Sequence, residues 1–137
     1  MKAKGVNRVL IAVRDVEEAS KRYSSLLGIR FWDAGVQEDF GVRAMVSWEG
    51  GVELIAPLDT DSRVARFLEK NGESIYGVAF NVTDIDRAVT AARQKGIRIT
   101  HTIDQDQSGK FKLFKEVCLH PAYTDGIFML LVQSQSK

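Results

Sequence analysis

Two charged residues stand inside apolar stretches of the sequence, and both carry side chains suited to acid–base chemistry. Arg8 interrupts the alternating segment 6–13, and Glu53 interrupts the short segment 52–56 that precedes Pro57. The planar guanidinium of arginine matches a carboxylate or enolate oxygen bidentately, and a glutamate withdrawn from water can act as a general base. Either charge needs a partner if it is buried, because an isolated ion inside a protein is strongly destabilising. Arg8 and Glu53 are therefore residues to follow, and the roles they could have depend on where the fold places them.

Three further side chains are candidates for contacting a ligand. His120 follows a strand in a Leu-His-Pro turn, where it could serve as a base, although a histidine bonded to the turn backbone is the preferred interpretation. Trp48 and Tyr76 lie on or beside strands, where an aromatic ring either joins the core or stacks on a ligand. Gly77 follows Tyr76, and its missing side chain is expected to leave room there.

The other reactive residues favour structural roles. Cys118 is the only cysteine, which excludes an intrachain disulfide, and its apolar strand predicts an inert core residue. His101 is expected at the surface beside the polar segment 104–112, which is predicted to be a mobile loop. Within that segment Gly109 and Lys110 fit a solvated hairpin better than a lid that attracts phosphate. The sequence contains no phosphate-binding glycine loop, nucleophile elbow or HExxH motif.

An internal repeat supplies the elements that would position these residues. A β-rich segment, a capping aspartate, a helix with an apolar stripe and a glycine stop occur twice, in the same order. Val13, Asp15, Val16 and Ala19 recur as Val82, Asp84, Ile85 and Ala88, each sixty-nine positions later. The sequence is therefore predicted to contain two copies of one module.

Each copy is predicted to be a strand-helix-strand-strand-strand (βαβββ) module. The first module spans 1–58, a short linker helix occupies 59–73, and the second module spans 74–137. The predicted strands are 6–13, 29–36, 40–48 and 52–56 in the first module and 75–82, 97–103, 113–119 and 126–133 in the second. One such module cannot cover both faces of its small sheet, so the two must pair, either within one chain or across a homodimer.

Composition narrows the class of protein further. The chain has 137 residues, of which 45% are hydrophobic, and its 19 basic and 18 acidic residues give a net charge of +1. This balance, without any block of like charges, predicts neither nucleic-acid binding nor attraction to an anionic membrane. No segment approaches the roughly 20 apolar residues that span a bilayer, and the first residues do not read as a signal peptide. A reducing cytoplasm is the expected location.

Several motifs resemble the vicinal oxygen chelate superfamily, which includes glyoxalases, extradiol dioxygenases, bleomycin-resistance proteins and methylmalonyl-CoA epimerases. The motifs most similar to the epimerases are VELIAPL at 52–58, ARFLEK at 65–70 and LHP at 119–121. The resemblance covers nearly the whole chain. It implies an α+β fold in which two paired βαβββ modules form a curved mixed sheet around a cavity, the glyoxalase/bleomycin-resistance fold.

The same resemblance implies a metal held by four side chains, and this sequence departs from that set. By motif register the four positions fall on Arg8, Glu53, Gly77 and Leu130, of which Glu53 alone matches. Gly77 and Leu130 offer no donor atom, and Arg8 brings a permanent cation. One carboxylate cannot hold a transition metal, so we expect neither a metal nor another cofactor. A metal site rebuilt from Glu53, His120 and loop acids is the remaining alternative.

Two functions are compatible with these residues. The first is a metal-independent isomerase, epimerase or lyase that acts on a small carboxylate or acyl thioester. Arg8 would then hold a carboxylate or enolate oxygen while Glu53 moves a proton. The second is a non-catalytic protein of the bleomycin-resistance type that binds an antibiotic or metabolite, with Arg8 and Glu53 forming only a structural ion pair. Both predict a small-molecule ligand and a homodimer, and the sequence does not choose between them.

Overall fold

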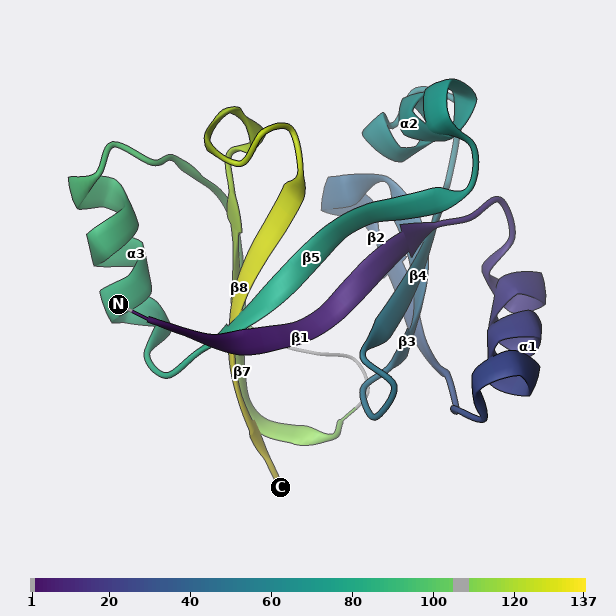
Figure 1. Ribbon diagram of the computed structural model, residues 1–137, viewed down its shortest axis with the longest axis horizontal. Helices are drawn as coiled ribbons and strands as arrows, with labels where there is room; N and C mark the ends of the chain where they lie inside the picture. The colour runs from purple at the N-terminus through teal and green to yellow at the C-terminus, as the bar shows by residue number, and fades with distance from the viewer. Residues whose placement is uncertain (1, 105–108) are drawn as a thin grey trace. The chain divides into compact units, whose positions relative to one another are not determined.

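The computed structural model describes residues 2–104 and 109–137 and belongs to the α+β class (Figure 1). Its elements are, in chain order, β1 (Ala3–Ala12), α1 (Val16–Leu27), β2 (Trp32–Gln37), η1 (Glu38–Phe40), β3 (Val42–Ser47), β4 (Val52–Pro57), α2 (Arg63–Asn71), β5 (Ser74–Val82), α3 (Ile85–Gln94), β6 (Ile99–Ile103), β7 (Phe111–Leu119), η2 (Pro121–Tyr123) and β8 (Phe128–Ser136). This order confirms two βαβββ modules with a helix between them. The predicted limits of the modules stay a prediction.

The chain divides into two compact units, of which one is Arg8–Tyr76. Its strands follow the order β2-β3-β4-β1, in which β1 runs parallel to β4 and the other neighbours are antiparallel. Helix α1 covers one face of this sheet and α2 covers the other. The alternation of a strand explains both contacts, because Val13 packs toward α1 while Ala12 packs toward Val64 of α2.

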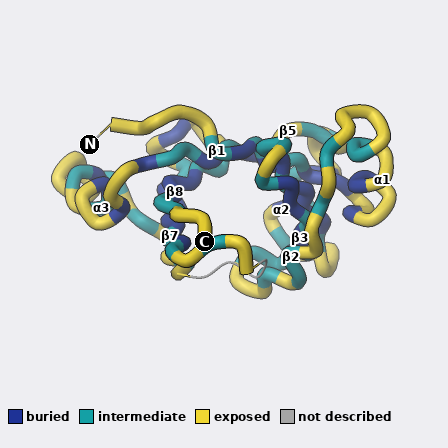
Figure 2. Tube along the Cα trace, turned by 90° about the horizontal axis from the view of Figure 1, so that it is seen from below, coloured by how far each residue is buried: buried dark blue, intermediate teal, exposed yellow. Residues whose placement is uncertain are grey.

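The second unit is Gly77–Lys137 together with the N-terminal residues through Asn7. Its strands follow the order β5-β8-β7-β6, with β5 parallel to β8 and the remaining neighbours antiparallel. Helix α3 covers one face, where Ala88 is fully buried among residues that include Val117 and Leu131. The described helices of neither unit combine the length and the apolar character that a membrane span requires. Figure 2 shows buried residues along the strands and exposed residues in the turns and at the chain ends.

The two predicted helix caps are confirmed and share one geometry. Asp15 is extended, with φ −140° and ψ 110°, and its carboxylate accepts the backbone N–H groups of Glu17 and Glu18. Asp84 has φ −144° and ψ 105°, and it accepts the equivalent two N–H groups at the start of α3. These bonds satisfy donors that a helix leaves unpaired in its first turn. The repeat therefore extends from the element order to the hydrogen bonds of the caps.

Four predicted strands begin two or three residues later than expected, namely β2, β3, β6 and β8. Turn geometry explains the shifts of β3 and β8. The predicted strand 40–48 is β3 from Val42, because Gly41 ends the short helix η1 in a left-handed conformation with φ 64°. The predicted strand 126–133 is β8 from Phe128. Asp125 and Gly126 both have positive φ values in the turn before it, 57° and 81°, and this backbone cannot continue a pleated strand.

Candidate functional site

Arg8 and Glu53 form a close ion pair on one face of the Arg8–Tyr76 sheet. Strands β1 and β4 are parallel neighbours, and their register places Leu10 opposite Glu53. Arg8 is two residues before Leu10 and therefore on the same face of the sheet. Its Nε donates to Glu53 Oε1 at 2.7 Å, the length of a charge-assisted hydrogen bond. The side chain of Arg8 is 3% exposed and that of Glu53 is 15% exposed.

Trp48 completes this cluster from the turn between β3 and β4. The predicted turn at 48–51 is confirmed, and Trp48 is its first residue, directly after β3. The Cζ atom of Arg8 lies over the indole ring, 5.1 Å from its centroid, which is within the range of a cation–π interaction. The structure thus brings together three of the five predicted site residues, namely Arg8, Glu53 and Trp48.

The other two predicted residues have structural contacts of their own. Tyr76 packs on the core beside α2, and its ring meets the edge of Phe67 with the centroids 5.0 Å apart. His120 belongs to the other unit, where its Nδ1 accepts the backbone N–H of Ala122 at 3.0 Å and caps the short helix η2. The interpretation of His120 as a backbone-bonded turn histidine is confirmed.

The expectation that Gly77 leaves open space is wrong. Gly77 pairs with Phe128 across β5 and β8. A Cβ atom added at Gly77 would overlap the carbonyl oxygen of Phe128 and lie 2.9 Å from the Phe128 Cβ. The glycine is needed because the backbone of the neighbouring strand already fills the place of a side chain.

The residues at the four family ligand positions do not fit a divalent metal ion. The carboxylate of Glu53 is bonded to the guanidinium of Arg8, which keeps a second cation away by charge. Gly77 has no side chain, and Phe128 occupies the space that one would need. Leu130 is a buried aliphatic residue without a donor atom for a metal. Among the described residues no group of three or more histidine, cysteine, aspartate or glutamate side chains could hold a metal. Part of the loop that would supply acids to a rebuilt site, 105–108, lies outside the described residues.

Glu116 is a buried acid that the sequence interpretation missed. It lies in β7, is 4% exposed, and alternates with the buried residues Phe114 and Cys118 on the face of the strand opposite Val117. The available signal was this alternation, since a glutamate between two buried positions of one face must itself be buried. No buried side-chain nitrogen or oxygen in the described part of the chain lacks a hydrogen-bond partner. Cys118 is fully buried, as predicted.

The predicted surface residues near the polar loop have ordinary contacts. His101 is half-buried on β6 rather than fully exposed, and its Nδ1 lies 3.1 Å from Thr100 Oγ1. Lys110 places its Nζ 5.7 Å from the centroid of the Phe111 ring. The predicted loop 104–112 is wrong at its end, because residues 111 and 112 belong to β7. Residues 105–108 of that loop lie outside the described part of the chain.

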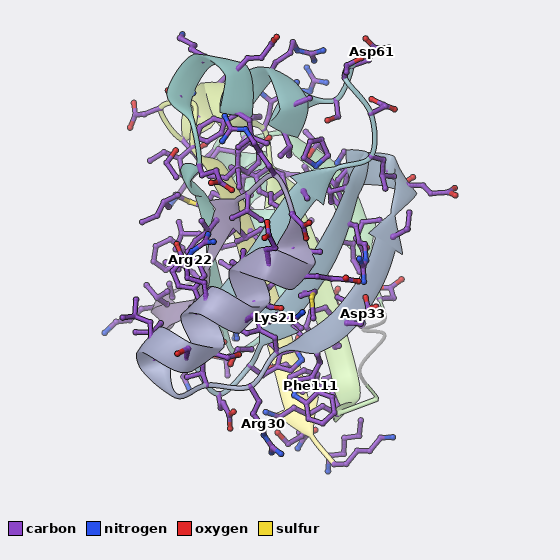
Figure 3. All side chains as sticks on the ribbon, turned by 90° about the vertical axis from the view of Figure 1, so that its right-hand side faces the viewer. Lys21, Arg22, Arg30, Asp33, Asp61 and Phe111 are labelled. Atoms are coloured by element: carbon purple, nitrogen blue, oxygen red, sulfur yellow. The ribbon has the colours of Figure 1, made fainter. Side chains whose placement is uncertain are left out.

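A second charged cluster joins α1 to the sheet of the Arg8–Tyr76 unit. Arg43 donates to Glu17 Oε1 at 2.9 Å and to Asp33 Oδ2 at 3.0 Å. The Gly35 N–H and the Arg43 guanidinium bond to Asp33 and hold the pKa of its carboxyl below the ordinary value. Hydrogen bonds to Glu17 and Asp33 raise the pKa of Arg43. Figure 3 shows α1 in front of these strands, with Lys21 and Arg22 on the helix and Asp33 labelled on β2.

Comparison with known proteins gives a consistent set of relatives. Residues 7–113 match the model of the Glyoxalase/Bleomycin resistance protein/Dioxygenase superfamily. The chain is 32% identical to the mitochondrial methylmalonyl-CoA epimerase of Homo sapiens over 133 residues, which cover 94% of this chain and 73% of the human protein. It is also 32% identical to the ethylmalonyl-CoA/methylmalonyl-CoA epimerase of Cereibacter sphaeroides, over 93% of this chain and 96% of that protein.

A solved structure extends the likeness to three dimensions. A variant of the methylmalonyl-CoA epimerase of Streptomyces coelicolor, in complex with 2-nitronate-propionyl-CoA, aligns with a TM-score of 0.77 and 27% identity. The alignment covers 97% of this chain and 99% of the Streptomyces chain.

Proposed function

The chain belongs to the glyoxalase/bleomycin resistance protein/dioxygenase superfamily, and we propose that it is an epimerase-type isomerase that acts on an acyl-CoA thioester without a bound metal. The relatives named as epimerases match more than nine-tenths of the chain, which supports the reaction class. The observation that carries the metal-independent form is the 2.7 Å pair of Arg8 and Glu53, because it places a base beside a fixed positive charge.

Glu53 is the proton-transfer residue in this proposal. Its carboxylate removes the proton from the carbon next to the thioester carbonyl, and the electron pair of the broken C–H bond moves onto the carbonyl oxygen to form an enolate. Water then delivers a proton to the opposite face of the same carbon, the enolate electron pair forms the new C–H bond, and the carbonyl re-forms with inverted configuration. Protonated Glu53 releases its proton to the solvent. Glu53 suits this role because it is partly withdrawn from water yet 15% exposed, which leaves the carboxylate within reach of a substrate.

Arg8 supplies positive charge to the oxygen on which negative charge develops. A guanidinium cannot give up its proton in a protein, so Arg8 stabilises the enolate without taking part in the proton transfer. The Nε–H group of Arg8 donates to Glu53 in the structure. A substrate carboxylate or enolate oxygen must therefore take over part of this contact, and that exchange releases Glu53 to act as the base.

The test is exchange of the substrate α-proton in deuterium oxide. Chelator-treated protein is incubated with methylmalonyl-CoA and with ethylmalonyl-CoA, and deuterium incorporation is followed by mass spectrometry. We expect exchange in the wild type, and a loss of at least about 100-fold in Glu53→Gln and in Arg8→Met. Glu49→Gln, a surface carboxylate that is 55% exposed, is the matched control and should retain the wild-type rate. Exchange that requires an added divalent metal would overturn the metal-independent mechanism.

The ion pair also favours a second candidate, a non-catalytic binding protein. Glu53 is already bonded to Arg8, as a purely structural pair would be. A thermal-shift series with the same acyl-CoAs and with antibiotics separates the two candidates, because a bound ligand raises the melting temperature whether or not it reacts. Stabilisation by a ligand without proton exchange would favour the binding protein. The homodimer and the cytoplasmic location stay predictions of the sequence in either case.

A further inference from the structure

The turn that carries Trp48 is fixed to the strand that carries Arg8. Gly51 accepts the backbone N–H of Val9, the residue after Arg8, at 2.9 Å. At the start of the turn, fully buried Ser47 accepts the Gly50 N–H on its Oγ at 3.1 Å. These bonds anchor the turn on both sides, so the backbone from which the indole ring extends is held beside β1.

Packing around Gly50 further restricts the turn. A Cβ atom added there would lie 2.8 Å from Ser47 Oγ and 2.6 Å from Ile29 Cδ1. A larger residue would have to displace the Ser47 hydroxyl or the Ile29 side chain, so Gly50 packs closely against both. The turn that carries Trp48 is thus hydrogen-bonded to β1 and closely packed at Gly50.

The guanidinium of Arg8 is held from two directions. The indole ring of Trp48 lies against it at 5.1 Å, and the carboxylate of Glu53 bonds to Nε. A long arginine side chain loses considerable rotamer freedom when it is ordered. Contact with an aromatic ring orders the guanidinium without using any of its five N–H donors, whereas each bond to a carboxylate uses one.

We propose that Trp48 is a positioning residue, which holds the guanidinium of Arg8 in the orientation that receives a ligand oxygen. Trp48 acts through Arg8 and does not stack on the ligand. This inference takes only the identity of the ligand from the proposed function. The role of Trp48 can be tested separately, because the orientation of the Arg8 side chain can be measured without turnover.

The chain offers a matched control in a second arginine–tryptophan pair of the same unit. The Cζ atom of Arg30 lies 5.8 Å from the centroid of the Trp32 ring. This pair is on the surface, with Trp32 51% exposed and the Arg30 side chain 79% exposed. Trp32→Leu removes the same kind of contact without touching Arg8.

The first experiment observes the Nε–Hε resonance of Arg8 by NMR of protein labelled with ¹⁵N-arginine, with the signal assigned from its loss in Arg8→Lys. We expect Trp48→Leu to broaden or shift this signal, Trp48→Phe to keep most of its position because a ring face remains, and Trp32→Leu to leave it unchanged. A signal that is the same in Trp48→Leu and Trp32→Leu would overturn the proposal. Circular dichroism melts confirm that each variant is folded.

The second experiment measures α-proton exchange with methylmalonyl-CoA. Trp48→Leu should lower kcat by about tenfold, which is the factor that corresponds to the free energy of a partly desolvated cation–π contact. The change in KM should be smaller. In the Arg8→Met background the same substitution should have no further effect, because the residue through which Trp48 acts is absent. An equal loss in both backgrounds would overturn the proposal. If the wild type exchanges no proton, the proposed function fails while the NMR experiment still decides the role of Trp48.

Discussion

The same place in the two repeats carries an ion pair in one unit and apolar packing in the other. Leu10 of β1 lies opposite Glu53 of the parallel strand β4. Sixty-nine positions after Leu10, Ala79 of β5 lies opposite Leu130 of the parallel strand β8. Strand order, direction and register are thus shared, whereas Glu53 has been exchanged for Leu130. The backbone of the repeat is compatible with either chemistry.

The difference shows what each unit requires of these positions. In the Arg8–Tyr76 unit the buried guanidinium is neutralised by a carboxylate 2.7 Å away. In the other unit the counterpart of Arg8 is Gly77, which faces the carbonyl oxygen of Phe128, and Leu130 is 3% exposed. A leucine at a buried position needs no hydrogen-bonding or oppositely charged partner, whereas a charged side chain at the same position would need one. Changes at Glu53 and Gly77 test this contrast directly. Changes at the helix caps and at Asp33 test a feature that the units share and one that belongs to a single unit.

The largest effect is expected when Glu53 is replaced by the residue of the other repeat. Glu53→Leu leaves the buried guanidinium of Arg8 without its closest carboxylate, and we expect a loss of about 3–5 kcal/mol in the free energy of unfolding. Urea unfolding measures it. The double variant Arg8→Met/Glu53→Leu should recover much of the loss, because the guanidinium that lost the carboxylate of Glu53 is then also removed. A double variant as unstable as the single one would show that the pair is not the cause.

A side chain at Gly77 should be the next most costly change. Gly77→Ala forces its Cβ into the carbonyl oxygen of Phe128, and we expect a loss of about 1–3 kcal/mol from overpacking. Ile75→Ala on the same strand is the control, because Ile75 is 64% exposed and surface substitutions change stability by about 0.5 kcal/mol or less. Equal urea midpoints for the two variants would mean that β5 and β8 separate easily.

The shared helix caps should respond alike in the two units. Asp15→Ala and Asp84→Ala each remove a carboxylate that accepts two backbone N–H groups, and each should cost about 1 kcal/mol. Chemical denaturation gives both values. Asp15→Asn and Asp84→Asn should retain most of the stability, since asparagine also caps well. A large difference between the two aspartate-to-alanine variants would show that the repeats depend unequally on their helices.

The smallest effect concerns the surface cluster that joins α1 to the sheet. The pKa of Asp33 is lowered in the folded protein, so its contribution is present above the unfolded pKa and is lost as pH falls through the folded value. Asp33→Asn should therefore melt slightly below the wild type at neutral pH, and the gap should close as pH falls below the lowered folded-state pKa of Asp33. Melting curves at several pH values measure it. The gap stays small because the Asp33 side chain is 57% exposed.

Much of the fold could be predicted because its signals are local. Each of these signals lies within about a dozen consecutive residues. They are the capping aspartates, the apolar stripes of the helices and the glycine that ends α1. The predicted starts of β2, β3, β6 and β8 are each two or three residues early. Left-handed residues at Gly41 and Asp125 delay β3 and β8. A positive φ at a non-glycine residue such as Asp125 is not visible in the sequence.

The candidate site was predicted only in part. Arg8 and Glu53 are predicted from the family ligand positions on which they fall, and Trp48 is predicted as an aromatic residue on or beside a strand. Tyr76 was predicted to contact a ligand and its ring contacts Phe67. Glu116 was overlooked, although its burial follows from the alternation of β7.

The sequence by itself determined the repeat, the order of its elements, the caps, and the presence of a cation and a carboxylate at corresponding family positions. Only the tertiary structure decided that Arg8 and Glu53 touch, that Trp48 lies against the guanidinium, and that the place beside Gly77 is filled by Phe128. These contacts join residues that are forty or more positions apart. They depend on the register of parallel strands, which local periodicity does not specify.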